Sequence, residues 1–317
     1  MARKTFYITT FLIALSEFPT LNDFQYAAPT TIDDAVQLLA QYGDRAKVLA
    51  GGTDIIVQLR EGLRSADMVV DAKKIPELMQ LDFSPTTGLR LGASVPCYQV
   101  YENAELQKAY PALCDSTRII GGWQIQSRAS VGGNLCNSSP AADCIPSLIV
   151  HTAVAHIAGP GGRRTVPIQE FCIAPGKNVL APGELLVALT LPPPAIRASS
   201  AYERFTPRNE MDITVAGAGS WLLLEEGANQ IKYARIALAA VAATTQFAKE
   251  ASDFLVGKEP TDDILAEAGE LAKKVASPID DMRGTIEYRT HLVGVLTKRT
   301  LARAAQRAND KRPVTND

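Results

Sequence analysis

Three consecutive prolines, Pro192 to Pro194, constrain the fold more strongly than any other feature of the sequence. Proline lacks a backbone N–H and has a fixed φ angle, so three in a row end a helix or a strand. The run directly follows residues 184–191, an apolar stretch that predicts a strand. Because a chain of 317 residues suits about two domains, we expect a boundary near residue 195.

Residues 24–74 alternate between helical and strand-like patterns. Thr31 is placed to cap a helix over residues 32–42. Short apolar runs at residues 47–50 and 68–70 predict buried strands. Such alternation of strands and helices indicates a small parallel sheet.

The rest of the chain is predicted to contain hairpin strands and helices. Before the prolines, the sequence predicts short helices over residues 96–103 and 111–120 and strands at 81–83, 89–91, 154–157, 165–166 and 184–191. After them, it predicts strands at 213–224 and 231–241, then helices at 244–255, 262–276 and 285–309. We therefore predict an α+β chain, with a leader extension at 1–21, a first domain at 22–195 made of sub-domains 22–77 and 78–195, and a smaller domain at 196–317.

Composition and charge exclude several classes of protein. A hydrophobic fraction of 46% and a net charge of -2 indicate an ordinary globular chain that does not bind nucleic acid through bulk charge. The helical spacing of Lys298, Arg299, Arg303 and Arg307 indicates a solvated or subunit-facing surface. No apolar run approaches the ~20 residues of a membrane span.

The cysteines and the amino terminus bear on the compartment. Five cysteines without compact spacing argue against a disulfide framework and favour the cytoplasm. Residues 1–16 offer a weaker alternative, because two basic residues, an apolar stretch and a small-residue site follow one another as in a signal peptide.

The usual catalytic motifs are missing from the sequence. It contains no GxxxxGK[ST], no GxGxxG after a strand and no HExxH. Of the three histidines, His151 and His156 fall in an apolar region, where a structural or surface role is expected. A hydrolase that relies on histidine is therefore disfavoured.

Two glycine pairs, in contrast, occur in similar settings. One is Leu49-Ala-Gly-Gly-Thr-Asp54, and the other is Ser130-Val-Gly-Gly-Asn134, each before a helix. Paired glycines let a backbone approach a ligand closely, and exposed consecutive amides bind phosphate oxygens. A simple turn explains either pair alone. Together they indicate a dinucleotide phosphate held between two sub-domains.

With these motifs the sequence resembles the flavin-binding subunit of molybdenum hydroxylases, the xanthine dehydrogenase and carbon monoxide dehydrogenase family. The resemblance covers about residues 24–305. Besides the glycine pairs, it rests on Phe24-Gln-Tyr-Ala-Ala-Pro29, Gln124-Ile125, Phe171 with Pro182-Gly-Glu-Leu-Leu186, and Tyr202-Glu-Arg-Phe205 followed by Arg208 and Asp212-Ile213.

The resemblance implies a fold like that of vanillyl-alcohol oxidase type flavoproteins, with FAD extended between the two amino-terminal sub-domains. Residues implied to bind FAD on one side are Leu49, Ala50, Gly51, Gly52, Thr53 and Asp54, and on the other Ser130, Gly132, Gly133, Asn134 and Asp143. Asp212 matches an acid on the loop near the flavin ring that can tune its electron exchange. The residues alone also allow a helix cap at Asp143 and a surface loop at Asp212.

Three departures from the family pattern stand out. Gln126 replaces a frequent basic residue, and the sequence leaves open whether Arg128 substitutes for it. Ala174 and Asn178 stand where glycine and threonine are frequent, so neither is assigned to the flavin. The scattered cysteines indicate buried small side chains and no iron–sulfur cluster or other metal site in this chain.

The sequence thus predicts the FAD-binding electron-transfer subunit of a molybdenum hydroxylase or dehydrogenase. The resemblance implies a large molybdopterin subunit and a small subunit with two-iron clusters, in a dimer of heterotrimers. Two alternatives remain: a stand-alone FAD-dependent oxidoreductase of the same fold, and a non-enzymatic flavin-binding protein. The sequence identifies neither the substrate of the complete enzyme nor the final electron acceptor.

Overall fold

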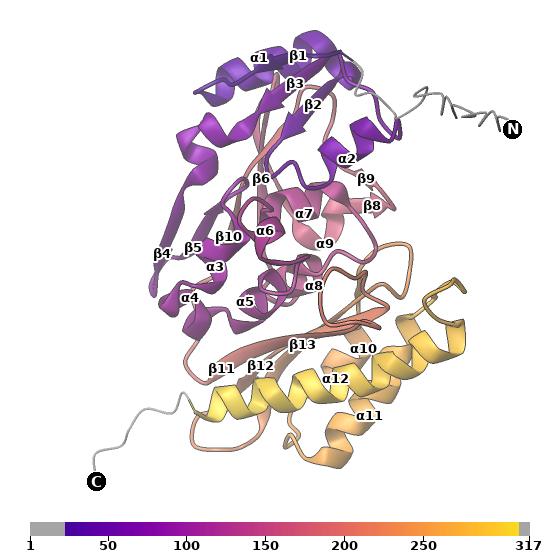
Figure 1. The fold of residues 1–317 in the computed structure, drawn as a ribbon. Coiled ribbons are helices and arrows are strands. Elements are labelled where there is room, and N and C mark those ends of the chain that lie inside the picture. The colour runs from indigo at the N-terminus through magenta and orange to yellow at the C-terminus, as the bar shows by residue number, and fades with distance from the viewer. Residues whose placement is uncertain (1–22, 311–317) are drawn as a thin grey trace, which may run out of the picture.

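The computed structural model describes residues 23–310, so the leader-like segment at residues 1–16 lies outside the described part. Three main sheets follow one another through the molecule (Figure 1). A small parallel sheet lies at one end, the C-terminal sheet with its helices at the other, and short helices fill the space between them.

The parallel sheet has three strands in the order β1-β3-β2, as the alternating pattern predicted. Helix α1, Ile32–Tyr42, begins where the Thr31 hydroxyl accepts a hydrogen bond from the Asp34 N–H at 3.1 Å. The other elements of this unit are β1 (Gln25–Ala27), β2 (Ala46–Leu49), α2 (Ile55–Arg60) and β3 (Met68–Asp71).

The second sheet is antiparallel in the order β4-β5-β10-β6-β7. Its strands are β4 (Leu81–Ser84), β5 (Gly88–Gly92), β6 (Val154–Gly159), β7 (Gly162–Pro167) and β10 (Leu185–Leu191). Both predicted hairpins are confirmed, and β10 joins them because it pairs with β5 on one side and β6 on the other.

Short helices lie between the strands of this sheet along the chain and form much of the central core. They are α3 (Cys97–Tyr101), α4 (Ala104–Ala109), α5 (Pro111–Thr117), α6 (Trp123–Gln126), α7 (Val131–Asn137), α8 (Cys144–Val150) and α9 (Ile168–Phe171). A small ribbon of β8 (Cys172–Ala174) and β9 (Lys177–Asn178) lies beside α7. The helix predicted over residues 96–103 is shorter, because Asn103 caps a new helix, α4.

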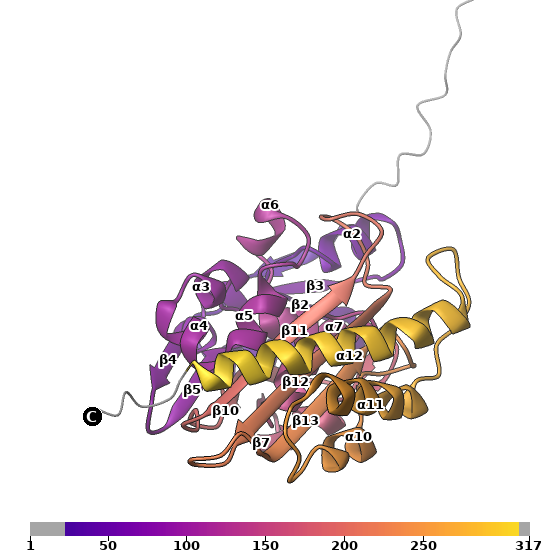
Figure 2. The same ribbon diagram turned by 90° about the horizontal axis from the view of Figure 1, so that it is seen from below.

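The C-terminal sheet has the order β11-β12-β13-β14 and is antiparallel. Figure 2 shows α12 lying along one face of this sheet. The elements are β11 (Ala198–Phe205), β12 (Ala216–Leu224), β13 (Ile231–Ala239), β14 (Gln246–Phe247), α10 (Lys249–Phe254), α11 (Asp262–Ala272) and α12 (Ile286–Asn309). Sequence analysis missed β11 and placed a helix over β14, because both strands are specified by pairing with distant residues.

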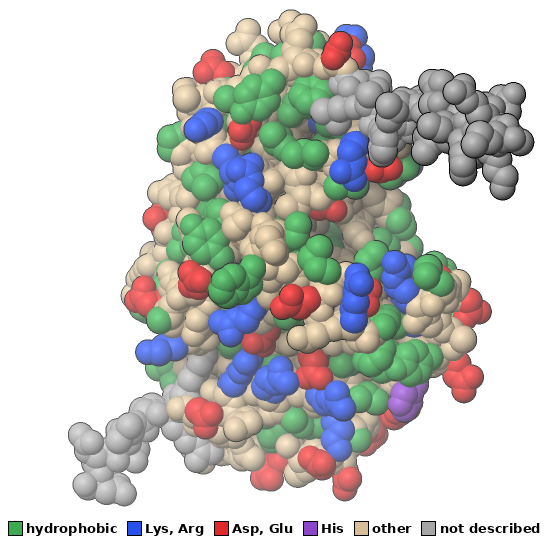
Figure 3. Space-filling model, in the orientation of Figure 1, with side chains coloured by type: hydrophobic (Ala, Val, Ile, Leu, Met, Phe, Trp, Pro, Cys, Tyr) green, Lys and Arg blue, Asp and Glu red, His purple; other side chains and the backbone are tan. Residues whose placement is uncertain are grey.

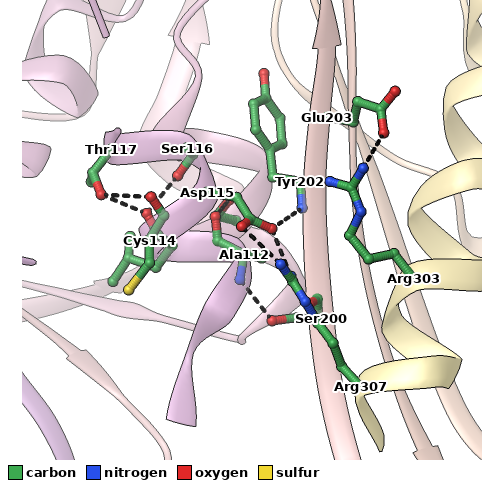
Figure 4. A network of polar contacts seen from close by, with 12 residues as sticks. Ala112, Cys114, Asp115, Ser116, Thr117, Ser200, Tyr202, Glu203, Arg303 and Arg307 are labelled. Atoms are coloured by element: carbon green, nitrogen blue, oxygen red, sulfur yellow. Dashed lines mark hydrogen bonds and ion pairs between the residues drawn. The ribbon is translucent and has the colours of Figure 1, made fainter. Parts of the chain in front are cut away.

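The basic positions of α12 are paired within the chain. Arg307 donates to both carboxylate oxygens of Asp115 at 2.7 and 3.0 Å, and Arg303 pairs with Glu203 (Figure 4). Arg299 also pairs with Glu203, and Lys298 pairs with Asp262. These contacts hold α12 against β11, α5 and α11. On the face drawn in Figure 3, acidic and basic side chains are interspersed.

His151 and His156 make structural contacts, as predicted. His151 contacts the Ser200 hydroxyl at 2.9 Å, and His156 contacts the Thr190 hydroxyl at 2.9 Å. The first contact joins the end of α8 to β11. It therefore helps to hold the C-terminal sheet against the central helices.

Candidate functional site

The first glycine pair forms the turn between β2 and α2. Leu49 ends the strand, and α2 begins directly after Asp54. Gly52 has a φ of 81°, in the left-handed region that favours glycine. A Cβ atom there would also lie 2.8 Å from Ile56 Cδ1, but this side-chain end can move, so the positive φ is the reason that the turn requires glycine.

The second glycine pair lies in the first turn of α7. The Ser130 hydroxyl accepts the Gly133 N–H at 3.0 Å and caps the helix. A Cβ on Gly132 would lie 2.4 Å from the Ala93 carbonyl oxygen, so this glycine permits close packing of α7. The Asn134 side chain accepts the Cys144 N–H at 3.2 Å and ties α7 to α8.

The two glycine-bearing segments touch each other. A Cβ on Gly51 would lie 2.6 Å from the Arg128 carbonyl oxygen, directly before the second segment. The Arg128 side chain donates to the Gly51 carbonyl at 3.3 Å. Farther along, the Asn137 amide donates to the Asp54 carboxylate at 3.3 Å. Residues that are ~80 apart in sequence therefore form one continuous wall.

A cavity of about 270 Å³ opens along this wall. The predicted residues that line it are Ala50, Gly51, Gly52, Thr53, Asp54, Ser130, Gly132, Gly133 and Asn134. Leu49, Asp143 and Asp212 do not line it. The structure thus brings together nine of the predicted binding residues, drawn from the two amino-terminal sheet units.

The cavity wall carries charges that sequence analysis did not identify. Lys47 and Arg64 line the cavity, and neither forms an ion pair with a residue of the described part, 23–310. Burial and the nearby Arg64 lower the pKa of Lys47, and burial raises the pKa of Asp54. Asp44 acts electrostatically on Lys47, and the Asp54 carboxylate also lines the cavity. Two cations that form no ion pair nevertheless suit an anionic group such as a pyrophosphate.

Gly133 supplies a second test of fit. Apart from its chain neighbours and the backbone of α7, a Cβ at this position would meet only Ser130 Oγ, at 3.1 Å. Packing of the protein therefore leaves space beside Gly133, on the wall of the cavity. The lack of a side chain there keeps the cavity open for a ligand, and the residues present fit the phosphate-bearing part of FAD.

Asp143 lies behind the cavity, 5% exposed. Its carboxylate accepts hydrogen bonds of 2.7 Å from Tyr202, Arg204 and Thr214. Burial raises the pKa of Asp143, and the Arg204 guanidinium opposes that rise. The side chain makes no helix-capping hydrogen bond at α8. Its predicted contact with FAD stays a prediction.

Asp212 lies in the loop between β11 and β12. Its carboxylate accepts the Ile213 N–H at 2.8 Å and the Arg208 N–H at 3.3 Å, so it shapes the loop itself. Met211 in this loop approaches α6, because a Cβ on Gly122 would lie 3.5 Å from its sulfur. The loop therefore lies beside the segment that contains Ile120, which lines the cavity.

Several lining residues escaped sequence analysis. Asn178, which the sequence does not assign to the flavin, lines the cavity and donates to the Cys136 carbonyl at 2.9 Å. Leu180 and Ile120 add apolar surface to the wall. Gln126, which replaces a basic residue frequent in the family, is 4% exposed and accepts a hydrogen bond from Tyr101. The basic side chain that reaches the first glycine loop is that of Arg128.

In residues 23–310, no helix is both long enough and apolar enough to cross a membrane. Within the same residues, no group of three or more histidine, cysteine, aspartate or glutamate side chains is arranged to hold a metal ion.

The fold and the site define a two-part α+β protein. Its parallel and antiparallel sheet units meet at two glycine loops around one cavity that suits a phosphate group. Residues 22–194 match the family model described as the FAD binding domain in molybdopterin dehydrogenase. Residues 200–304 match the CO dehydrogenase flavoprotein C-terminal domain. The chain therefore belongs to the FAD-binding subunits of molybdopterin dehydrogenases.

Individual relatives agree with this assignment. The xanthine dehydrogenase FAD-binding subunit of Escherichia coli O157:H7 is 32% identical over 289 residues, which cover 90% of this chain and 97% of that protein. The carbon monoxide dehydrogenase medium chain of Afipia carboxidovorans is 32% identical over 290 residues, covering 91% and 99%. A chain of the reconstituted carbon monoxide dehydrogenase from Oligotropha carboxidovorans superposes with a TM-score of 0.86 at 30% identity, covering 91% and 99%. The predicted family, fold class, FAD cofactor and oxidoreductase class are confirmed.

Proposed function

We propose that this chain carries electrons from iron–sulfur clusters on a partner subunit to an external acceptor. Bound FAD supplies the chemistry, because it accepts and releases electrons reversibly. The partners in this proposal are a large molybdopterin subunit and a small subunit with two-iron clusters, in a dimer of heterotrimers. The names of the relatives, a FAD-binding subunit and a medium chain, support an assembly of several subunits.

The contact between the two glycine loops carries the proposal. In our assignment, one loop holds the pyrophosphate of FAD from the β2–α2 side and the other from the α7 side. Lys47 and Arg64 would offset its negative charge, because both line the cavity and neither forms an ion pair with a described residue, although Asp44 acts electrostatically on Lys47. The residues assigned to the pyrophosphate are Ala50, Gly51, Gly52, Thr53, Asp54, Ser130, Gly132, Gly133 and Asn134.

The remaining assigned residues position the site from its margins. Leu49 ends β2 and packs against the Gly52 turn. A Cβ atom added at Gly52 would lie 3.1 Å from the Cδ1 atom of Leu49. We assign Asp143 to the second-loop side of the cofactor, since it orients Arg204, whose Nη2 donates to the Ile119 carbonyl at 2.8 Å. We assign Asp212 to the loop near the flavin ring, where its charge would tune the reduction potential.

The division at residues 195 and 196 and the cytoplasmic location remain proposals. Tyr110 donates to the Pro192 carbonyl at 2.7 Å, so the proline run is anchored to the first domain of this division. The five cysteines are all free, which supports a reducing compartment.

Anaerobic reduction by the organic substrate of the complete complex tests the electron-transfer role. The purified chain should retain FAD, yet its flavin absorbance should not bleach when that substrate is added alone. Addition of the molybdenum and iron–sulfur subunits should restore bleaching. Equal bleaching rates with and without the partners would instead identify a stand-alone oxidoreductase, and a chain that binds FAD but exchanges no electrons with any partner would be a non-enzymatic flavin protein.

A pair of alanine variants tests the site itself. In Gly133→Ala the new Cβ meets, outside its own helix, only the Ser130 hydroxyl at 3.1 Å, which needs a small adjustment, so the fold should persist while FAD retention falls. In Gly51→Ala the Cβ would collide with the Arg128 backbone at 2.6 Å, so stability and FAD retention should fall together. Flavin absorbance and circular dichroism measure the two effects separately. Full FAD retention in both variants would place the cofactor elsewhere.

A further inference from the structure

A second cavity, of about 460 Å³, lies between the central helices and the C-terminal sheet. It shares no lining residue with the cavity at the glycine loops. Its walls come from the end of α8, the proline run and one face of β12 to β14. Its volume falls in the range of about 300–1,000 Å³ that is typical of small-molecule sites.

Aromatic side chains line this second cavity on several sides. They are Tyr110, Trp221, Tyr233 and Phe247, with Pro192, Pro193 and Pro194 adding a further apolar wall. Trp221 is paired with Arg235 across β12 and β13, so the two side chains emerge on the same face of the sheet. Tyr233 is 58% exposed and stands at the open side of the cavity. Surfaces of this kind accept a flat ring by stacking or edge contact.

One half-buried cation sits among these rings. The guanidinium of Arg235 lies 4.3 Å from the centre of the Phe247 ring. Its Nε and Nη2 atoms donate to the Ile149 carbonyl at 3.2 and 3.1 Å, which fixes the plane of the group. Within residues 23–310, no carboxylate forms an ion pair with Arg235, and Nη1 has no hydrogen-bond acceptor.

The other charged groups of the cavity do not neutralise Arg235. Asp253, an acidic residue that lines the cavity, forms an ion pair with Lys249. His151, buried at the inner end, contacts the Ser200 hydroxyl. The net electrostatic character of the cavity is therefore positive. A cationic ligand would be repelled, and a neutral one would leave the guanidinium without a counter-charge.

We propose that this cavity is a binding site for a small planar aromatic carboxylate, with the carboxylate on Arg235 and the ring between Trp221, Phe247 and Tyr233. A guanidinium binds a carboxylate through parallel N–H groups, and the free Nη1 edge is available for this. The site joins the central helices to the C-terminal sheet. It does not rest on the proposed electron-transfer role, because the two cavities share no residue.

Calorimetric titration of the FAD-loaded full chain with three probes tests the ligand class. 2-Naphthoate should bind with a stoichiometry of one. 2-Naphthamide has the same ring without the charge, and cyclohexanecarboxylate has the charge without the aromatic ring. Each should bind at least about tenfold more weakly than 2-naphthoate. Equal affinities for naphthoate and naphthamide, or no naphthoate binding at millimolar concentration, would overturn the proposal.

Substitutions locate the binding. Arg235→Met should weaken naphthoate binding roughly tenfold to a hundredfold, because it removes a charge-assisted hydrogen bond. Lys232→Met is the matched control, since it removes a cation from the same strand outside the cavity and should leave affinity unchanged. If Arg235→Met does not fold, Tyr233→Ala changes a largely exposed ring and should weaken binding through lost stacking. Unchanged affinity in the folded variants would refute this location.

Fluorescence supplies an independent readout. The chain has 2 tryptophans, and Trp123 is 84% exposed, so Trp123→Phe leaves Trp221 as the only indole at little cost to the fold. At one shared concentration that saturates the site with naphthoate, cyclohexanecarboxylate and naphthamide should shift the Trp221 emission less than naphthoate does. Flavin absorbance should stay constant throughout. An unchanged Trp221 emission during saturation with naphthoate would place the ligand elsewhere.

Discussion

Replacement of Arg204 by methionine should destabilise the protein strongly, because it breaks a buried ion pair. The Arg204 guanidinium lies 2.7 Å from Asp143, and both side chains are 7% exposed. Methionine approximates the aliphatic part of the side chain but leaves the Asp143 carboxylate without its cation. Removal of one partner of a buried pair typically costs about 3–5 kcal/mol. Since Tyr202 and Thr214 still donate to Asp143, we expect about 3 kcal/mol in the free energy of unfolding.

The pH dependence gives this prediction a distinctive sign. Without Arg204, burial should raise the pKa of Asp143 further above its value in the unfolded chain. Between these two pKa values the folded variant binds more protons than the unfolded one, so its stability falls as pH rises. The loss relative to wild type should therefore be larger at about pH 8 than at about pH 5.

Urea unfolding followed by circular dichroism at both pH values measures the loss. Arg163→Met is the control, because Arg163 pairs with Glu77 at 2.7 Å but its side chain is 59% exposed. An exposed pair of this kind contributes about 1 kcal/mol or less. A loss in Arg204→Met no larger than in the control, or a loss that grows as the pH falls, would refute the reasoning.

Three further predictions address the flavin site and its surroundings. Gly52→Val and Gly133→Val should abolish FAD retention, measured by absorbance of the purified chain, and full occupancy in both would contradict the pocket. Asp212→Ala should shift the flavin reduction potential and the rate of acceptor reduction while FAD stays bound; loss of FAD with an unchanged potential in the remaining holoprotein would contradict this role. Burial and nearby Arg128 lower the pKa of Lys73 to about 8. Between about pH 8 and about pH 10 the unfolded chain therefore binds more protons at Lys73 than the folded chain. In urea unfolding, the stability of wild type relative to Lys73→Met should rise over this pH range. A difference in stability that does not change with pH would argue against the lowered pKa.

Local signals were sufficient to predict much of the fold. The Thr31 cap and the apolar face that follows it predicted α1, and the structure begins and ends this helix at the predicted residues. Both hairpins of the second sheet were predicted from apolar runs separated by glycine and proline. In each case the signal lies within ~15 residues, because capping and turn formation depend on neighbours in the chain.

The sequence also revealed the two glycine pairs, since glycine is conspicuous wherever a backbone turns sharply or approaches a ligand. It did not reveal why each glycine is required. The Cβ that Gly51 lacks would collide with the backbone at Arg128, whereas the Cβ that Gly133 lacks would meet only one hydroxyl oxygen. This difference depends on how two sub-domains pack, and no local pattern encodes it.

What the sequence by itself determined is the family, most of the elements before the proline run and the two loops at the cavity. Only the tertiary structure decided which charged residues serve the cavity and which serve the fold. The regular basic spacing on α12 indicated a surface, yet Arg307 and Arg303 bind acids on α5 and β11. Lys47 and Arg64 belong to no motif, yet both line the cavity and neither forms an ion pair with a described residue. The physical reason is that an ionic interaction depends on distance in space and on burial, and both are set when distant segments pack together.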